Sequence, residues 1–383
     1  MPALGPSSVR STVGLAPADL SAVDEALVRT VEEQAQALSA VSDELTDLLG
    51  AVRALMVGGK RLRAAFCVWG ARGVTGHSSA ADGHPAAGPA PAGPGVVEAA
   101  AALEMFHLGA LVHDDVMDRS ALRRGVPTVH RSFADLHRTS GASGDADAFG
   151  DSVAVLVGDL CFTWADDLLD RAARACLAAG REAAGAHARV VWERMRTQTL
   201  AGQYLDLVAQ SRPDTTASAA TAVLHYKSAK YTVEHPLMLG GALAGAPDAL
   251  LDAYAAFGLC VGEAFQLRDD VLGVFGESTV TGKSTFDDVR EGKRTMLVAY
   301  AEEAATPEQL VQLRRRLGDE DLDAEGLAAV RTLLTDTGAL DRVEARIEET
   351  VTQALAGLER MPVPQDAREA LAELTEASVW RTA

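Results

Sequence analysis

Two pairs of adjacent aspartates lie far apart in this sequence, and each pair follows an apolar run. The pairs are Asp114-Asp115, with Asp118 close behind, and Asp269-Asp270. Neighbouring carboxylates repel each other and are costly to bury, so apolar surroundings imply that cations compensate them. Carboxylate oxygens suit Mg²⁺, which commonly shares its coordination shell with substrate phosphates. The pattern predicts two facing helices that hold a diphosphate between them.

The two acidic clusters differ in how complete they are. On a helix, Asp114 and Asp118 are four residues apart and share a face. A solvated acidic helix end is the alternative for such a cluster, but the apolar run 105–112 before it favours a metal site. The second cluster has Gly273 where a third acid would stand. The downstream pair Asp287-Asp288 is a candidate for the missing carboxylate.

Composition favours helices and excludes several classes of partner. The 383 residues are 48% hydrophobic, only 5% aromatic and rich in alanine, which predicts an all-α fold with a sizeable core. The net charge of −19 disfavours nucleic acid and anionic membranes as partners. Four widely spaced cysteines form no metal motif and predict reduced thiols in a cytoplasmic protein. No signal peptide is evident, and no apolar stretch approaches membrane-spanning length free of charge.

The pattern along the chain predicts a loose tail over residues 1–17 and a single helical domain over 18–383. A first helix is expected from Pro17 to about Met56. Loop insertions are expected near 73–95, which is rich in glycine and proline, and near 139–150. Helical periodicity predicts further helices over 95–118, 151–179, 181–209, 215–244, 247–275 and 291–305, followed by a charged helical tail.

Basic residues stand beside glycines or beside the acidic clusters. They are Lys60, Arg61 and Arg63 after two glycines, Arg123 and Arg124 after the first cluster, Lys227 and Lys230, and Lys283, Lys293 and Arg294 after the second cluster. Scattered lysines in an acidic chain are usually solvated. Here, backbone amides and cationic side chains can converge on an anion, which favours diphosphate binding.

Taken together, these motifs resemble the trans-isoprenyl diphosphate synthases, also called polyprenyl synthetases. The matching segments, in family order over about residues 50–300, are Gly58-Gly59-Lys60-Arg61-Leu62-Arg63, Asp114-Asp115-x-x-Asp118 with Arg123-Arg124-Gly125, Lys227-Ser228, Gln266-x-x-Asp269-Asp270, Gly282-Lys283 and Arg290-Glu291-Gly292-Lys293-Arg294-Thr295. The resemblance implies an all-α isoprenoid synthase-type bundle around a central cavity, usually a homodimer. Gly273 and Ala64 depart from the family pattern, and Gly273 puts full metal affinity in doubt.

The resemblance also implies a role for each matching residue. Metal ligands would be Asp114, Asp115, Asp118, Asp269 and Asp270, which hold about three Mg²⁺ on the allylic diphosphate. That diphosphate would also contact Arg123, Lys227, Gln266, Lys283 and Lys293. Isopentenyl diphosphate would bind Lys60, Arg63, His107 and Arg124. His107 lies seven residues before Asp114, two helical turns away and so on the same face.

The implied reaction joins isopentenyl diphosphate head-to-tail to an allylic diphosphate in the trans configuration. Product length depends on the side chains below Asp114, since one helical turn of about 5.4 Å is close to one isoprene unit. Gly109 and Ala110 leave room one turn down, and Phe106, together with Met105, is the expected floor. We therefore expect geranylgeranyl diphosphate, with farnesyl and longer-chain products as open alternatives.

Three other functions are alternatives to prenyl transfer. A class I terpene cyclase shares the bundle but usually carries an Asn/Ser/Glu metal motif in place of Asp269-Asp270. A di-iron bundle needs two Glu-x-x-His pairs, and only Glu104-x-x-His107 matches. A non-catalytic partner subunit typically loses an acidic motif, and only Gly273 points that way.

Overall fold

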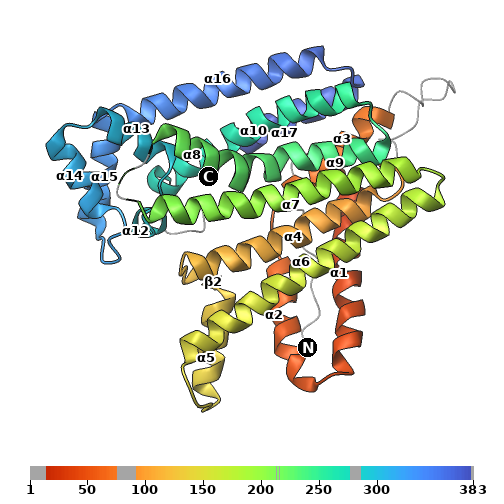
Figure 1. Cartoon of the computed structure of the whole chain (residues 1–383), viewed down its shortest axis with the longest axis horizontal. Helices are drawn as coiled ribbons and strands as arrows, with labels where there is room; N and C mark the ends of the chain where they lie inside the picture. Colours follow the sequence, from red (N-terminus) through yellow and green to blue (C-terminus); the bar gives the residue numbers. More distant parts are fainter. Residues whose placement is uncertain (1–13, 76–91, 213, 215, 277–285, 381–383) are drawn as a thin grey trace.

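The computed structural model describes residues 14–75, 92–212, 214, 216–276 and 286–380. Most of the predicted tail and residues 76–91 of the first predicted insertion lie outside them. The described chain is an all-α bundle, as predicted (Figure 1). Its one sheet among these residues is a two-stranded hairpin, β1 (Leu122–Arg123) and β2 (Val126–Pro127).

The helices of the amino-terminal two thirds of the chain build the larger of two apolar cores. They are α1 (Pro17–Ser39), a 3₁₀ turn (Asp43–Leu45), α2 (Thr46–Met56), α3 (Leu62–Thr75), α4 (Val96–Met117), α5 (Val129–Thr139), α6 (Ala146–Ala178), α7 (Glu182–Gln210), α8 (Ala217–Val223), a π-helix (Leu224–Glu234), α9 (His235–Ala244) and α10 (Asp248–Phe275). In this core α4 packs mainly on α6, α3 packs on α9, and α10 packs on the π-helix.

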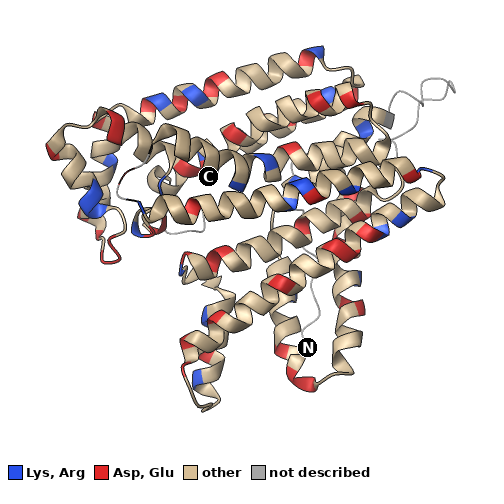
Figure 2. Ribbon diagram, in the orientation of Figure 1, with Lys and Arg blue, Asp and Glu red and all other residues tan. Residues whose placement is uncertain are grey.

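The remaining helices are α12 (Asp287–Arg290), α13 (Met296–Ala304), α14 (Pro307–Arg316), α15 (Ala324–Asp336), α16 (Ala339–Arg360) and α17 (Gln365–Val379). Helices α12 to α15 and the first part of α16 form a second core with α8 and the end of α10, whereas the end of α16 and most of α17 pack into the larger core. Figure 1 shows α16 lying along α10 on one side, while α1, α2 and α5 project from the other. Charged residues of both signs are spread over these outer helices (Figure 2).

Glycines allow α3 and α9 to cross closely in the larger core. A Cβ on Gly240 of α9 would run into the carbonyl oxygen of Cys67 on α3, and one on Gly70 of α3 would meet the carbonyl oxygen of Leu237. Because the interior is close-packed, any side chain at these positions would force the two backbones apart.

Two predicted boundaries are wrong for local reasons. The expected helix 17–56 is a helical hairpin, broken at residues 40–45, where Ser42 caps the 3₁₀ turn by accepting from the amide of Glu44. The predicted loop 139–150 is shorter, because Asp145 caps α6 by accepting from the amides of Asp147 and Ala148 at 2.9 and 3.2 Å. A side-chain cap of this kind sets where a helix begins.

Among the described residues, three helices are long and apolar enough to cross a membrane by length and composition alone. They are α4, α6 and α10, and 67%, 39% and 56% of their most apolar windows are buried inside the protein. All four cysteines are free thiols; Cys67, Cys161 and Cys176 are buried and Cys260 is half-buried.

Candidate active site

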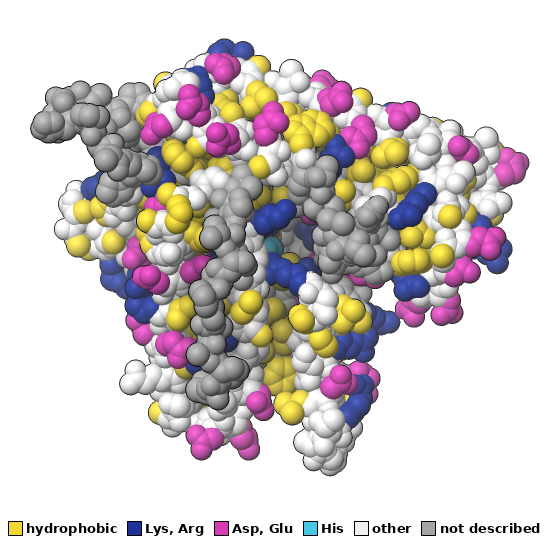
Figure 3. All heavy atoms as spheres, turned by 180° about the vertical axis from the view of Figure 1, so that it is seen from behind, with side chains coloured by type: hydrophobic (Ala, Val, Ile, Leu, Met, Phe, Trp, Pro, Cys, Tyr) yellow, Lys and Arg dark blue, Asp and Glu magenta, His cyan; other side chains and the backbone are white. Residues whose placement is uncertain are grey.

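A cavity of about 590 Å³ lies between α4, α7, the π-helix and α10, and both acidic clusters reach it. Seen from behind, basic side chains stand at the rim of a hollow in this face (Figure 3). The predicted residues that line the cavity are Lys60, Arg63, Phe106, His107, Ala110, Asp114, Arg123, Arg124, Lys227, Gln266, Asp269, Asp270 and Lys293. Lys283 lies outside the described residues.

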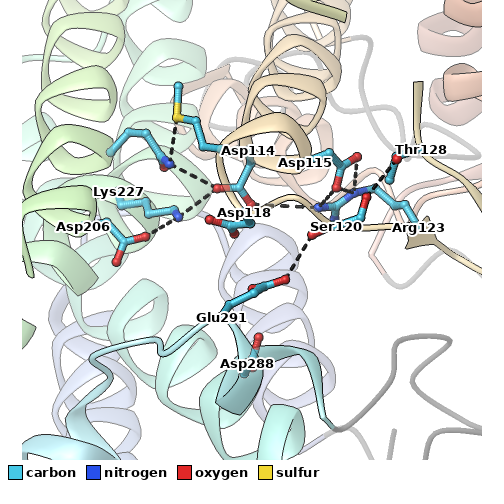
Figure 4. Close-up of polar contacts among 12 residues, drawn as sticks. Asp114, Asp115, Asp118, Ser120, Arg123, Thr128, Asp206, Lys227, Asp288 and Glu291 are labelled. Atoms are coloured by element: carbon cyan, nitrogen blue, oxygen red, sulfur yellow. Dashed lines mark hydrogen bonds and ion pairs between the residues drawn. The ribbon is translucent and has the colours of Figure 1, made fainter. Parts of the chain in front are cut away.

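Asp114 occupies the centre of the polar contacts in Figure 4. Its Oδ1 accepts from Lys227 Nζ at 2.9 Å and from Gln203 Nε2 at 3.3 Å. Burial would raise the pKa of Asp114, but the charges of Lys227 and Lys293 outweigh it and hold the pKa below its ordinary value. The carboxylate is therefore ionised at the cavity wall, ready to attract cations.

Asp115 and Arg123 form a tight pair beside the cavity. Arg123 Nε donates to both oxygens of Asp115 at 2.8 and 2.9 Å, and its Nη2 lies 2.6 Å from Oδ1. Asp115 is only 2% exposed and does not itself line the cavity. Such a charge-assisted bidentate contact fixes the orientation of the guanidinium. Asp115 thus orients Arg123, and metal ligation by Asp115 would require Arg123 to release an oxygen.

Burial raises the pKa of two other carboxyl groups, Asp118 and Asp270, to near neutral pH. The pKa of Asp118 rises to about 7, chiefly because the group is buried and then because Asp114 repels it. The pKa of Asp270 rises to about 8, again chiefly through burial and then through Asp288 and Asp269. In addition, Asp118 Oδ1 is buried and has no hydrogen-bond partner among the described residues.

These carboxyl groups fit Mg²⁺ as a donor set, although they are not preassembled around one point. Among the described residues, no three His, Cys, Asp or Glu side chains are close enough to form a metal centre. Lysines and Arg123 instead lie against the acids. Hard oxygen donors that are buried and partly unpartnered are nevertheless what a divalent cation would satisfy, by ionising the carboxyl groups it binds.

Asp288 stands at the place of the missing third aspartate. A Cβ built on Gly273 of α10 would run into Oδ2 of Asp288, which α12 carries to this spot. Asp288 Oδ1 also accepts from Lys293 Nζ at 3.0 Å. The downstream pair suggested by the sequence therefore does place a carboxylate beside the second cluster, and Asp288 is the member that does so.

Lys227 is held by two carboxylates on different helices. Its Nζ donates to Asp114 on α4 and to Asp206 on α7, the latter at 2.6 Å. Burial would lower the pKa of Lys227, but these two acids raise it, so the ammonium keeps its proton. The lysine sits in the π-helix, a rare backbone form that is frequent at functional sites. Lys230, by contrast, pairs with Glu234 in the same helix and does not line the cavity.

Lys60, Arg63, His107 and Arg124 form a basic rim on one side of the cavity. Tyr231 connects two of these residues, His107 and Arg63. Its Oη lies 2.5 Å from Nδ1 of His107, and the guanidinium of Arg63 stands 4.1 Å from its ring centroid. Burial, followed by the charge of Arg63, holds the pKa of His107 well below its ordinary value. His107 is therefore a neutral imidazole facing cationic neighbours, which suits a binding role rather than proton transfer near neutral pH.

The rim begins where the chain turns between α2 and α3. Gly58 and Gly59 have φ of 92° and 88°, values that residues with a side chain rarely adopt. The turn that they make brings Lys60 and Arg63 to the cavity. Arg61 turns inward instead, donating to Asp24 at 2.9 Å and standing 3.6 Å from Glu104. Lys60 and Arg63 of this motif therefore face the cavity, whereas Arg61 stabilises the fold through its contacts with Asp24 and Glu104.

Several polar groups at the site have no role predicted from the sequence. Gln203 and Asp206 come from α7, Tyr231 from the π-helix, and Glu291 accepts from Ser120 at 3.0 Å. Glu291 stood within a matched motif but received no role. These side chains reach the site only through helix packing, and a pattern along the chain does not show that.

The apolar end of the cavity differs from the expectation in part. Phe106 and Ala110 line it, as expected, whereas Gly109 and Met105 do not. Phe162 of α6, which the sequence did not suggest, lines it together with Phe106.

Comparison with known proteins agrees with this geometry. The family model described as polyprenyl synthetase matches residues 46–334. The chain belongs to the polyprenyl synthetase family. It is 31% identical to a geranylfarnesyl diphosphate synthase of Aeropyrum pernix, covering 85% of this chain and 92% of that one. It is 32% identical to a nonaprenyl diphosphate synthase of Mycobacterium tuberculosis, covering 98% of each.

A solved structure extends the likeness to the fold. The geranylgeranyl pyrophosphate synthase from Corynebacterium glutamicum, complexed with isoprenyl diphosphate and magnesium, superposes with a TM-score of 0.85 at 35% identity, covering 94% of this chain and 98% of that one. The polyprenyl synthetase described here is thus a trans-prenyltransferase, as the motifs predicted, and the cyclase and di-iron alternatives fall away.

Proposed function

We propose that this cavity joins isopentenyl diphosphate head-to-tail to an allylic diphosphate and releases geranylgeranyl diphosphate. The observation that carries the proposal is that both acidic clusters, the lysines and a set of apolar side chains share one cavity. The polar end fits two diphosphate groups, and the apolar end fits a growing prenyl chain. We also propose that residues 18–383 act as a single catalytic domain.

The allylic diphosphate would bind between α4 and α10. Asp114, Asp118, Asp269 and Asp270 would hold about three Mg²⁺ on it, with Asp115 joining if Arg123 releases an oxygen. The bound ions would supply Lewis-acid stabilisation of the departing pyrophosphate. Direct contacts would come from Arg123, Lys227, Gln266, Lys283 and Lys293. Asp288 supports the second cluster in the place of the family's third aspartate.

Isopentenyl diphosphate would bind at the basic rim, against Lys60, Arg63, His107 and Arg124. This would place the second substrate beside the start of α3. Neutral His107, held by Tyr231, can donate or accept a hydrogen bond without adding charge.

The residues of the cavity then favour ionisation of the allylic substrate. Lys227 and Lys293 stabilise negative charge on the leaving pyrophosphate where it develops. The apolar walls exclude water from the allylic cation, which the double bond of isopentenyl diphosphate attacks. The proton lost from the condensed product passes to the released pyrophosphate, so the protein needs no general base.

We further propose a homodimer. Helices α6 and α7 pack side by side and expose the large apolar side chains of Val155, Leu156, Leu200 and Tyr204. Exposed apolar groups on neighbouring helices are typical of protein interfaces. Light scattering of the purified protein tests this assembly, which a monomeric mass would contradict. The free thiols are consistent with a cytoplasmic location.

The reaction is tested by incubating the protein with isopentenyl diphosphate and dimethylallyl, geranyl or farnesyl diphosphate, with and without Mg²⁺. Products are dephosphorylated and separated by chromatography. We expect a twenty-carbon alcohol, formed only with the metal. Absence of condensation with every primer would support a non-catalytic subunit, and a shorter or longer main product would correct the chain length alone.

A further inference from the structure

Phe162 on α6 takes the space that Gly109 on α4 leaves open. A Cβ added to Gly109 would lie 2.9 Å from Cε1 and 3.0 Å from Cδ1 of the Phe162 ring. Both distances are shorter than ordinary carbon–carbon contact of about 3.5–4.0 Å. The ring therefore packs directly on the glycine, and the absence of a side chain at residue 109 makes room for Phe162 rather than for product.

The ring of Phe162 also lies beside the predicted floor. Its centroid is 4.8 Å from that of Phe106, in a tilted arrangement, and 5.2 Å from that of His113, edge to face. Both phenylalanines line the cavity. The rings of Trp192 and Tyr231 each stand 5.8 Å from that of Phe106 and pack against it. Two rings from two helices thus close the apolar end.

We propose that Phe162 is a determinant of product length, acting as the second half of a floor whose first half is Phe106. The inference rests on the proposed prenyl transfer in this cavity. If Phe106 alone formed the floor, only truncation of Phe106 would deepen the cavity. If two rings form the floor, truncation of either Phe106 or Phe162 deepens it. Chain elongation stops where the growing end meets them, so removing either ring allows at least one further condensation.

Size supports this consequence. Phe162→Ala removes a six-carbon ring, slightly more than the five carbons of an isoprene unit. The space this opens lies between α4 and α6, next to Gly109. Substituting Gly109 is not a clean test, because its Cβ would also lie 2.9 Å from the carbonyl oxygen of Gly158.

The test compares Phe162→Ala, Phe162→Leu and Phe106→Ala with the unmodified protein in the same product assay. Phe149→Ala is the matched control, since Phe149 is also on α6 but is 42% exposed and does not line the cavity. We expect the main product of Phe162→Ala to be at least one five-carbon unit longer than that of the unmodified protein, with Phe149→Ala unchanged. If Phe162→Ala does not fold, Phe162→Leu, which keeps apolar packing, should still shift part of the product to the longer length.

Binding gives a second measurement. With Mg²⁺, a prenyl diphosphate one unit longer than the product should raise the melting temperature of Phe162→Ala more than that of the unmodified protein. Unchanged product length in both Phe162 variants, while Phe106→Ala lengthens it, would overturn the proposal and leave Phe106 as the sole floor. Failure of the proposed function would look different, because the unmodified protein itself would then form no product.

Discussion

Oδ2 of Asp288 occupies the position where a side chain on Gly273 would begin. The second acidic cluster therefore keeps a third carboxylate, supplied by α12 rather than by the next turn of α10. Gly273 is not a simple loss from the motif, because an aspartate there would collide with the group that stands in for it.

Asp288→Asn should weaken the affinity for Mg²⁺ without abolishing activity. Groups that support metal ligands typically contribute 10–100-fold in metal affinity, so we expect the Mg²⁺ concentration for half-maximal rate to rise roughly 10-fold. Asp287→Asn is the control, because Asp287 itself does not line the cavity. Equal Mg²⁺ curves for the two variants would remove Asp288 from the metal site.

Lys227→Ala should lower kcat far more than it changes folding. Removing one preorganised donor that faces developing charge costs roughly 10²–10³-fold in kcat. Lys230 lies three residues further along the same π-helix and pairs with Glu234, so Lys230→Ala should keep the rate of the unmodified protein. Steady-state rates and circular dichroism of both variants measure the effect; comparable rates would mean that Lys227 only balances Asp114 and Asp206.

Tyr231→Phe should raise KM for isopentenyl diphosphate while leaving KM for the allylic substrate near its original value. The change deletes the hydroxyl that contacts His107 Nδ1 at 2.5 Å, and a hydrogen bond worth about 1 kcal/mol corresponds to about fivefold in affinity. Tyr226→Phe provides the comparison on an exposed ring of the same helix. An equal rise in both KM values would argue against a specific role at the basic rim.

Ala110→Phe should shorten the product and Phe106→Ala should lengthen it. Both side chains line the apolar end, and one helical turn of about 5.4 Å separates positions that stop successive isoprene additions. Chromatography of the dephosphorylated products reads both shifts. The hypothesis of a floor on α4 fails if neither variant changes the product.

Gly240→Ala should lower the stability of the bundle by about 1–3 kcal/mol, because the new Cβ meets the backbone of Cys67 and forces α3 from α9. Gly50→Ala is the opposite case: its Cβ would meet nothing within 4 Å, and alanine is favoured in an exposed helix. Urea unfolding should therefore move the two midpoints in opposite directions. A shift of the same sign and size would contradict the packing argument.

The sequence predicted those parts of the site that are written in local patterns. Apolar runs ending in aspartates placed α4 and α10, and the glycine pair before Lys60 marked the turn that starts the rim. The break in the first helix and the start of α6 were missed because single caps, at Ser42 and Asp145, decide them. Phe162, Asp206 and Gln203 were missed because they reach the site only through contacts between helices distant in sequence, which no periodicity reports.

The central claim is that Asp114 and Asp270, on facing helices, share divalent cations with a single diphosphate. Its most direct test is a crystal structure of the protein with Mg²⁺ and a non-hydrolysable allylic diphosphate analogue. We predict the headgroup between α4 and α10, with metal-bound oxygens from both acidic clusters and with Lys227 and Lys293 against the phosphates. A headgroup bound elsewhere, or bound here with metal touching only one of the two helices, would contradict the account.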